Sequence, residues 1–181
     1  LIGPRQVGKT FLMEQLRDML QGKGEKTVFL NLDLEKDKKF FITQKTLLDN
    51  IKVQVGNSKA YVFIDEIQRK DNAGIFLKGI YDMNLPYKFI VSGSGSLDLK
   101  AKIKESMAGR KRLFEINPIS FVEFVNFKTD YQYEDRIEDF FRIMTDKSLG
   151  LLEEYLIYWG YPKVVLSETA DEKKHEIDEI Y

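Results

Sequence analysis

The stretch from Gly3 to Thr10, GPRQVGKT, has residue types that could bind the phosphates of a nucleotide. Gly3, Gly8, Lys9 and Thr10 match the pattern G-x-x-x-x-G-K-[ST]. A chain of this length shows this pattern by chance about 1% of the time or less. In such a loop, glycines let the backbone approach the phosphates, N–H groups form a nest for the anion, and the lysine reaches the β- and γ-phosphates. We expect the threonine hydroxyl to bind Mg²⁺. The residues expected at the nucleotide are Gly3, Pro4, Arg5, Gln6, Val7, Gly8, Lys9, Thr10 and Phe11.

Two acidic residues follow an apolar run at the position where a metal-binding carboxylate is needed. Asp65 and Glu66 come directly after YVFI, residues 61–64. Mg²⁺ takes few protein oxygens and keeps several waters, so we predict that Asp65 holds the metal together with Thr10. Glu66 is predicted to accept a hydrogen bond from the attacking water. The alternative is that both acids only end a strand in solvent, and a glycine turn before a helix is the corresponding alternative for the loop.

A Ser/Gly segment and one arginine are further candidates for contacts with the transferring phosphate. KFIVSGSGSL offers Ser92 and Ser94, and Ser94 is preferred because Gly93 is where the strand is expected to end. A Gly/Ser turn without a ligand is the alternative. Arg110 could stabilise charge that develops on the phosphoryl group, in its own site or in that of a neighbouring subunit, although surface arginines are common.

Apolar runs alternate with helical periodicity along the first two thirds of the chain, which predicts an α/β fold. Because the strands are apolar throughout, we expect a mostly parallel sheet covered on both faces, with three layers as in P-loop NTPases. Ser120 and Glu123 predict a capping box at the start of a short helix. Strands are expected over residues 27–33, 60–66, 88–92 and 112–116, helices over 12–20, 47–55, 76–81 and 96–106, and a solvated loop over 35–39.

The character of the sequence changes near residue 128, after which helical apolar stripes follow and no strand is evident. We therefore predict an ATPase-like domain over residues 1–127, with its first strand truncated at Leu1, and the start of a helical C-terminal region over 128–181. The missing strand before the loop suggests an excerpt of a longer protein, since strands are usually about five residues long.

Composition excludes several classes of protein. The chain of 181 residues has a net charge of −1, one histidine and no cysteine, which rules out disulfides, thiolate metal sites and a His-rich centre. No apolar run approaches the length of a membrane span, and a reducing cytoplasm fits the lack of cysteine. The overall charge gives no basic field for nucleic acid, but basic residues cluster locally at Lys100, Lys102, Lys104, Arg110, Lys111 and Arg112.

Several of these segments resemble the AAA_14 type of bacterial and archaeal AAA-superfamily ATPases. The resemblance covers nearly the whole chain and rests on GPRQVGKT, FIDEIQ, GSGSL, AGR and NPISFVEF, while EEYLIYWGYPKVVL is similar to the start of the DUF4143 region that often follows. It implies that Gly3 to Thr10 is the Walker A motif, Asp65-Glu66 the Walker B motif, Ser94 the sensor position and Gly109-Arg110 the Gly-Arg step. It also implies an additional strand between the loop strand and the Asp65 strand, ATP and Mg²⁺ as cofactors, and a C-terminal region linked to the PD-(D/E)XK nucleases. Ser92 departs from the threonine usual in the family.

The leading hypothesis is therefore an enzyme that hydrolyses ATP with Mg²⁺, in which Lys9, Glu66, Ser94 and Arg110 act on the γ-phosphate. The absence of an N-K-x-D motif disfavours guanine. The alternatives are a slow nucleotide-gated switch that controls docking of an unidentified protein or a second copy, and a DNA-associated ATPase.

Overall fold

The computed structural model describes residues 1–95 and 106–180, and its contacts divide the chain into two units, each described here by itself. The first comprises Leu1–Pro4 and Gly8–Ile116, and the second comprises Arg5–Val7 and Asn117–Tyr181. The division after Ile116 precedes the boundary predicted near residue 128. The reason is that α6 (Phe121–Lys128) buries Phe124 and Val125 in one core with Phe140 and Val165, which belong to later helices.

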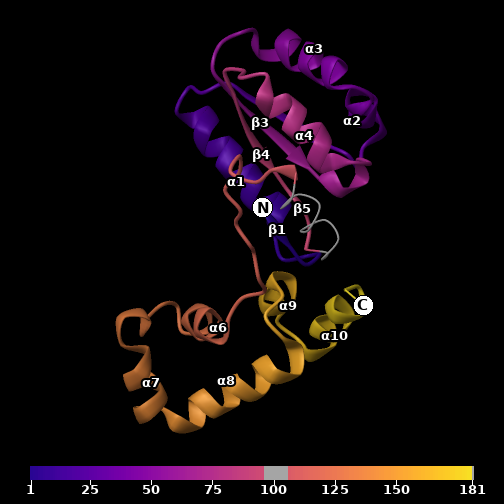
Figure 1. Ribbon diagram of the computed structural model, residues 1–181. Coiled ribbons are helices and arrows are strands. Elements are labelled where there is room, and N and C mark those ends of the chain that lie inside the picture. The colour runs from indigo at the N-terminus through magenta and orange to yellow at the C-terminus, as the bar shows by residue number, and fades with distance from the viewer. Residues whose placement is uncertain (96–105, 181) are drawn as a thin grey trace. The chain divides into compact units, whose positions relative to one another are not determined.

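The first unit alternates strands and helices (Figure 1), but the strand predicted over residues 112–116 is reduced to a single parallel bridge between Glu115 and Ile2. The helix predicted over residues 96–106 lies almost wholly outside the described residues. The charged run over residues 35–39 is predicted as a loop but forms a short helix. Asp37 in this helix is buried, and its carboxylate accepts a 2.9 Å hydrogen bond from the Asn31 N–H. The elements are β1 (Ile2–Gly3), α1 (Lys9–Gly22), β2 (Thr27–Asn31), α2 (Glu35–Lys38), η1 (Lys39–Phe41), α3 (Gln44–Val55), β3 (Ala60–Asp65), η2 (Ile67–Arg69), α4 (Ala73–Asp82), β4 (Tyr87–Val91) and β5 (Gly93–Ser94).

Parallel pairing connects all of these strands. β2 pairs with β3 and β3 with β4, while β5, which continues β4 beyond Ser92, pairs with β1. On the side of β1 away from β5, the Ile2 N–H donates to the Phe114 carbonyl at 2.9 Å, and the Ile2 carbonyl accepts from the Ile116 N–H at 2.7 Å. Residues 87–94 therefore lie between β1 and β3, which confirms the additional strand implied by the resemblance. All the strands end at the same edge of the sheet.

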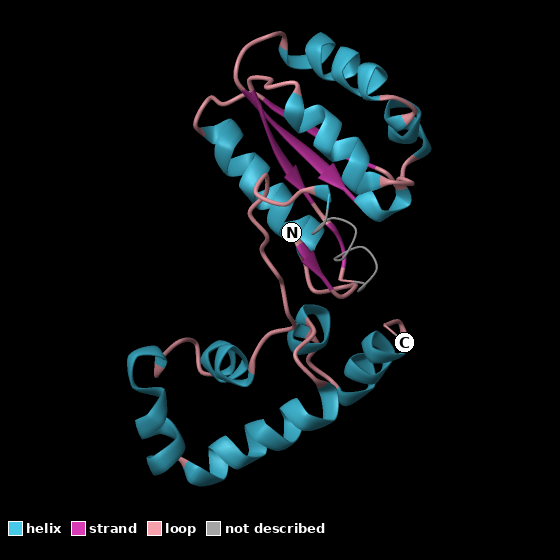
Figure 2. Ribbon diagram, in the orientation of Figure 1, coloured by secondary structure: helices cyan, strands magenta, loops and turns pink. Residues whose placement is uncertain are grey.

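Helices cover both faces of this sheet (Figure 2). Side chains alternate across a strand, so Val62 and Ile64 face the core built with α3 and α4. Phe63 points to the other face and stacks on Phe29, and Arg17 of α1 lies over the Phe29 ring. Val62, Phe63 and Ile64 are completely buried. This burial on both faces explains the continuous apolar run and confirms the three-layer α/β architecture.

The second unit is helical, with no strand among residues 117–180. The predicted capping box opens α6: the Ser120 hydroxyl accepts from the Glu123 N–H at 3.3 Å, and the Glu123 carboxylate accepts from the Ser120 N–H at 2.7 Å. Aromatic rings of Phe121, Phe124, Phe140, Phe141 and Tyr155 form its core. The remaining elements are η3 (Glu134–Arg136), α7 (Ile137–Ile143), α8 (Thr145–Tyr158), α9 (Pro162–Leu166) and α10 (Ala170–Asp178).

A charged cluster ties helices of this unit together. The buried Lys173 amine donates to Glu154 Oε1 at 2.6 Å, and Lys128 forms an ion pair with the same oxygen at 3.2 Å. Burial acts to raise the pKa of the Glu154 carboxyl, but the hydrogen bonds from the two amines outweigh it, so the pKa lies below its usual value. In the two described ranges, no helix is long and apolar enough to cross a bilayer.

Candidate functional site

The loop between β1 and α1 has the backbone geometry that the phosphate pattern predicts. Gly8, at the N-cap of α1, has a φ of 90°, a left-handed conformation that residues with a Cβ adopt only under strain. The loop strand is also approached closely by β5, because the Gly95 N–H donates to the Gly3 carbonyl at 2.8 Å. A Cβ on Gly95 would lie 3.0 Å from the Gly3 carbonyl carbon, so a larger residue there would require the backbone to shift by a few tenths of an ångström.

The Lys9 amine lies against the backbone of this loop. Its Nζ donates to the carbonyl oxygens of Gly3 at 3.1 Å and Pro4 at 2.6 Å, and only 6% of the residue is exposed. The lysine amine therefore lies against the loop, at the first turn of a helix, where the helix dipole favours an anion.

The other predicted loop residues differ in exposure. Val7 is buried, whereas Phe11 is 60% exposed. Gln6 takes a φ of 61°. The exposed members of the loop are Pro4, Arg5 and Gln6.

Thr10 and Asp65, the two predicted metal ligands, are in direct contact. The Thr10 hydroxyl donates to Asp65 Oδ2 at 2.7 Å, although the residues are far apart in the sequence. Asp65 is completely buried at the end of β3, and its other oxygen, Oδ1, accepts from the Ser92 hydroxyl and from the Glu66 N–H. These donors hold the carboxylate at the carboxyl edge of the sheet, where open α/β sheets bind ligands.

The donor set of this pair fits Mg²⁺. The ion prefers hard oxygen ligands and is usually held by one or two protein groups, with phosphates and water completing its coordination. Thr10 Oγ1 and Asp65 Oδ2 are such oxygens, and they lie at the start of the helix that follows the loop. The described part of the chain contains no group of three or more His, Asp or Glu side chains that could hold a metal by themselves.

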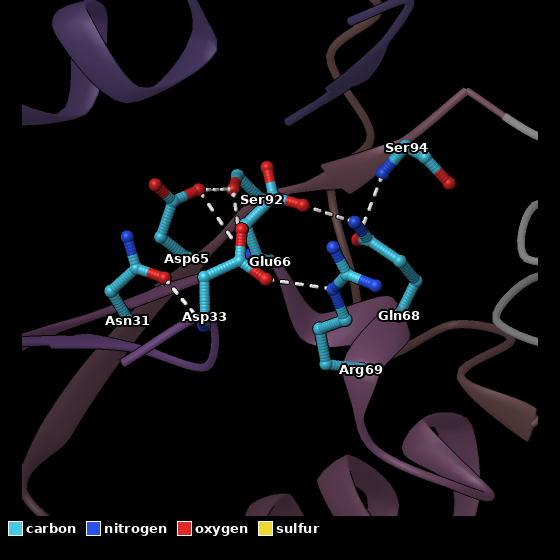
Figure 3. A network of polar contacts seen from close by, with 8 residues as sticks. All are labelled: Asn31, Asp33, Asp65, Glu66, Gln68, Arg69, Ser92 and Ser94. Carbon is cyan, nitrogen blue, oxygen red and sulfur yellow. Dashed lines mark hydrogen bonds and ion pairs between the residues drawn. The ribbon is translucent and has the colours of Figure 1, made fainter. Parts of the chain in front are cut away.

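Glu66 follows Asp65 in a strained backbone conformation. Its φ of 58° lies in the left-handed region, which costs an ordinary residue roughly 1–2 kcal/mol. Its N–H points to Asp65 Oδ1 at 3.1 Å, and its carboxylate accepts from the side-chain amide of Gln68 (Figure 3). Because strained residues concentrate at functional sites, this geometry is consistent with the role predicted for Glu66.

Of the two candidate serines, Ser92 is the one whose hydroxyl contacts the Asp65 carboxylate. Ser92 is 1% exposed, and its Oγ donates to Asp65 Oδ1 (Figure 3). Ser94 lies two residues further along, at the end of β5, and its N–H donates to Gln68 Oε1 at 3.0 Å. The break between β4 and β5 falls at Ser92, one residue before the position expected from Gly93.

Arg110 is not brought to this edge of the sheet. Its Nε donates to Asp82 Oδ1 at 3.1 Å, and Asp82 is the last residue of α4. α4 begins after β3 and ends before β4 starts at Tyr87, so Asp82 lies near the opposite edge, where the strands begin. Three other basic residues of the predicted local cluster lie outside the described residues: Lys100, Lys102 and Lys104.

Two residues near the acidic pair were not assigned roles from the sequence. Gln68 bridges Glu66 and Ser94, and Arg69 forms an ion pair with Asp33 at 2.7 Å (Figure 3). Both belong to η2, a single turn that no periodicity reveals. Only the adjacency of Gln68 to the acidic pair in FIDEIQ could have pointed to it.

Comparison with known families agrees with this geometry. The AAA_14 family, described as an AAA domain, matches residues 1–125. This chain belongs to the AAA_14 family. Membership covers the whole of the first unit, with its nucleotide-binding type of P-loop, and α6 up to Val125.

Relatives in two organisms extend the similarity over almost the whole chain. A protein of Methanocaldococcus jannaschii is 28% identical over 181 residues, which are 99% of this chain and 38% of that protein. A protein of Haemophilus influenzae is 28% identical over 174 residues, which are 92% of this chain and 40% of that protein. Both are described only as uncharacterized proteins, and the chain spans about two fifths of their length.

Among solved structures, the Aeropyrum pernix ORC1 protein in complex with DNA is similar at a TM-score of 0.43 and 11% sequence identity. The match covers 74% of this chain and 43% of that one.

Proposed function

We propose that this AAA_14 chain binds ATP with Mg²⁺ and hydrolyses it by in-line attack of water on the γ-phosphate. The observation that carries the proposal is the 2.7 Å contact between the Thr10 hydroxyl and Asp65 Oδ2. It joins the first turn after the phosphate loop to the end of β3, so that the lysine, the hydroxyl and both acids share one edge of the sheet. Phosphoryl transfer needs these parts together, since its catalysis is mostly positioning and charge neutralisation.

Each group has a distinct role in this proposal. Lys9 would exchange its two loop carbonyls for the β- and γ-phosphate oxygens, and Thr10 and Asp65 would hold Mg²⁺, which when bound neutralises phosphate charge. Glu66 would accept a hydrogen bond from the attacking water. Ser94, at the end of β5, remains the proposed contact for the γ-phosphate.

Arg110 would act on the nucleotide of a neighbouring copy. Its ion pair with Asp82 places it near the edge where the strands begin, away from Asp65 in the same unit. A guanidinium there is suited to reach a second chain, as arginine fingers supplied in trans do. Self-association through the first unit is part of this proposal.

Further assignments follow from family membership and composition. ATP is proposed over GTP because the family is of the AAA type. The cytoplasm is proposed as the location because the chain lacks cysteine. Residues 128–181 lie beyond the residues that the family matches, and we propose that they begin a DUF4143-like region.

The proposal is tested by nucleotide binding and turnover. We expect ATP to bind more tightly with Mg²⁺ than without it, and Lys9→Ala to weaken binding by at least about 10-fold, because charged hydrogen bonds contribute about 1.5–3 kcal/mol each. Lys23→Ala, which removes an exposed cation beyond the other end of α1, is the matched control and should bind normally.

Glu66→Gln should bind ATP but hydrolyse it much more slowly in the steady state, because an amide oxygen is a poorer acceptor for the water proton. ATP binding that is indifferent to Lys9→Ala would contradict the site. Wild-type turnover no faster than that of Glu66→Gln would leave binding without catalysis, as in a nucleotide-gated switch.

A further inference from the structure

Gln68 connects the acid proposed to orient water with the strand proposed to lie beside the γ-phosphate. Its side-chain Nε2 donates to Glu66 Oε2, and its Oε1 accepts from the Ser94 N–H at 3.0 Å (Figure 3). One amide thus uses a donor on one partner and its acceptor on the other. Neither contact follows from the loop pattern or from the metal pair.

The turn that carries Gln68 is held in place on two sides. The Ile67 N–H donates to the Ser92 carbonyl at 3.1 Å, and the Ile67 side chain is 1% exposed. On the other side, the Arg69 guanidinium pairs with Asp33, which follows β2. The main chain beside Gln68 is therefore fixed at Ile67, and a half-exposed ion pair of Arg69 adds to this on the other side.

Glu66 itself has less local support. Its backbone is in the left-handed region, and it lies between β3 and η2, so no regular element orients its side chain. A partly exposed glutamate loses rotamer entropy when it is fixed. A hydrogen bond from a neighbour that is already anchored can supply that order and leave the second carboxylate oxygen, Oε1, to accept from water.

We propose that Gln68 is a positioning residue that holds the Glu66 carboxylate in the orientation required for attack and links it to the backbone at Ser94. This inference rests on the proposed ATP hydrolysis and assigns a further residue to it. Gln68 touches neither nucleotide nor water in this proposal and acts through Glu66. Its removal therefore changes the rate of the chemical step and not the affinity for ATP.

The test is a double-mutant cycle in steady-state ATP hydrolysis. We expect Gln68→Ala to lower kcat about 10-fold with little change in the KM for ATP. In the Glu66→Gln background, the same change should cost nothing further, since the group it positions is already gone. Gln15→Ala, an exposed glutamine on α1, is the matched control and should leave kcat unchanged.

Gln68→Glu separates the two contacts. A carboxylate can still accept from the Ser94 N–H but cannot donate to Glu66, so its kcat should fall at least as far as that of Gln68→Ala. Urea unfolding of each variant, with a midpoint near that of the wild type, distinguishes positioning from loss of folded protein.

The possible failures are distinguishable. If the wild type binds ATP but does not turn it over, the proposed hydrolysis fails, and the role of Gln68 fails with it. If the wild type turns over and Gln68→Ala has an unchanged or higher kcat, or costs the same factor in both backgrounds, only the role of Gln68 is overturned.

Discussion

The hydrogen bond between Thr10 and Asp65 should stabilise the first unit before any ligand binds. Thr10→Val removes the hydroxyl while keeping the size and β-branching of the side chain, so helix propensity hardly changes. The Asp65 side chain is completely buried, and the lost bond is 2.7 Å long with a carboxyl oxygen as its acceptor. The Ser92 hydroxyl and the Glu66 N–H still donate to the other oxygen, Oδ1.

The expected magnitude follows from that geometry. A hydrogen bond to a charged group contributes about 1.5–3 kcal/mol, and Asp65 Oδ2 would lose its 2.7 Å donor in a site with little access to water. With a urea m-value of roughly 2 kcal/mol per M, the unfolding midpoint of the first unit should fall by about 1 M. Thr10→Ser keeps the hydroxyl and is the matched control, with a smaller loss due only to the methyl group.

Hydrogen exchange of the β3 backbone amides, measured in increasing urea, reports on this unit. Trp159, the single tryptophan, belongs to the second unit, and its fluorescence should show an unchanged transition. In ATP binding, Thr10→Val should also lose the increase in affinity caused by Mg²⁺, while Thr10→Ser keeps it. Equal midpoints for Thr10→Val and Thr10→Ser would refute the energetic reasoning, and an intact Mg²⁺ effect in Thr10→Val would refute the metal role.

Three further predictions concern the second unit and are measured by urea unfolding followed through Trp159 fluorescence. Gly160→Ala should destabilise it by about 1–3 kcal/mol, because the new Cβ would lie 1.9 Å from the Ile119 carbonyl oxygen, a backbone atom; no loss of stability would show that this backbone yields easily. Gly150→Ala should stabilise it by about 0.5–1 kcal/mol, since Gly150 is exposed within α8 and its Cβ would meet no atom within 4 Å; a loss would contradict that reasoning. Glu154 has a folded-state pKa below its usual value, so the stability it contributes is present above its unfolded-state pKa and is lost as the pH falls through the lower, folded-state pKa. Glu154→Gln should therefore lower the stability at neutral pH by about 1–3 kcal/mol and make the stability of the second unit depend less on acid pH. Equal curves of stability against pH for the two proteins would count against this prediction.

Much of the first unit could be predicted from the sequence because its signals are local. An apolar run of four residues before Asp65 identifies a strand buried on both faces, and Gly8 marks a left-handed turn before a helix. The pattern around Lys9 and the acidic pair therefore located the candidate site, and the parallel α/β class followed from the alternation of elements. The capping box at Ser120 was equally local, since all its bonds lie within four residues.

The contacts inside the site were decided by tertiary structure. Which serine meets Asp65 depends on where β4 gives way to β5, and that break is set by pairing with β3 on one side and β1 on the other. Gln68 lies two residues from Glu66, but it reaches its other partner, Ser94, only because η2 meets the end of β5. Arg110 is placed by its ion pair with Asp82, a partner that no spacing in the sequence indicates.

The kinds of element and the candidate residues for phosphate chemistry could be predicted from local sequence, because backbone preference and burial act over a few neighbouring positions. The order of strands, and with it which of those residues touch, depends on how the folded chain pairs its strands. Hydrogen bonds between strands join segments separated by dozens of residues, and a side chain such as Asp65 has no defined partner until those segments are paired.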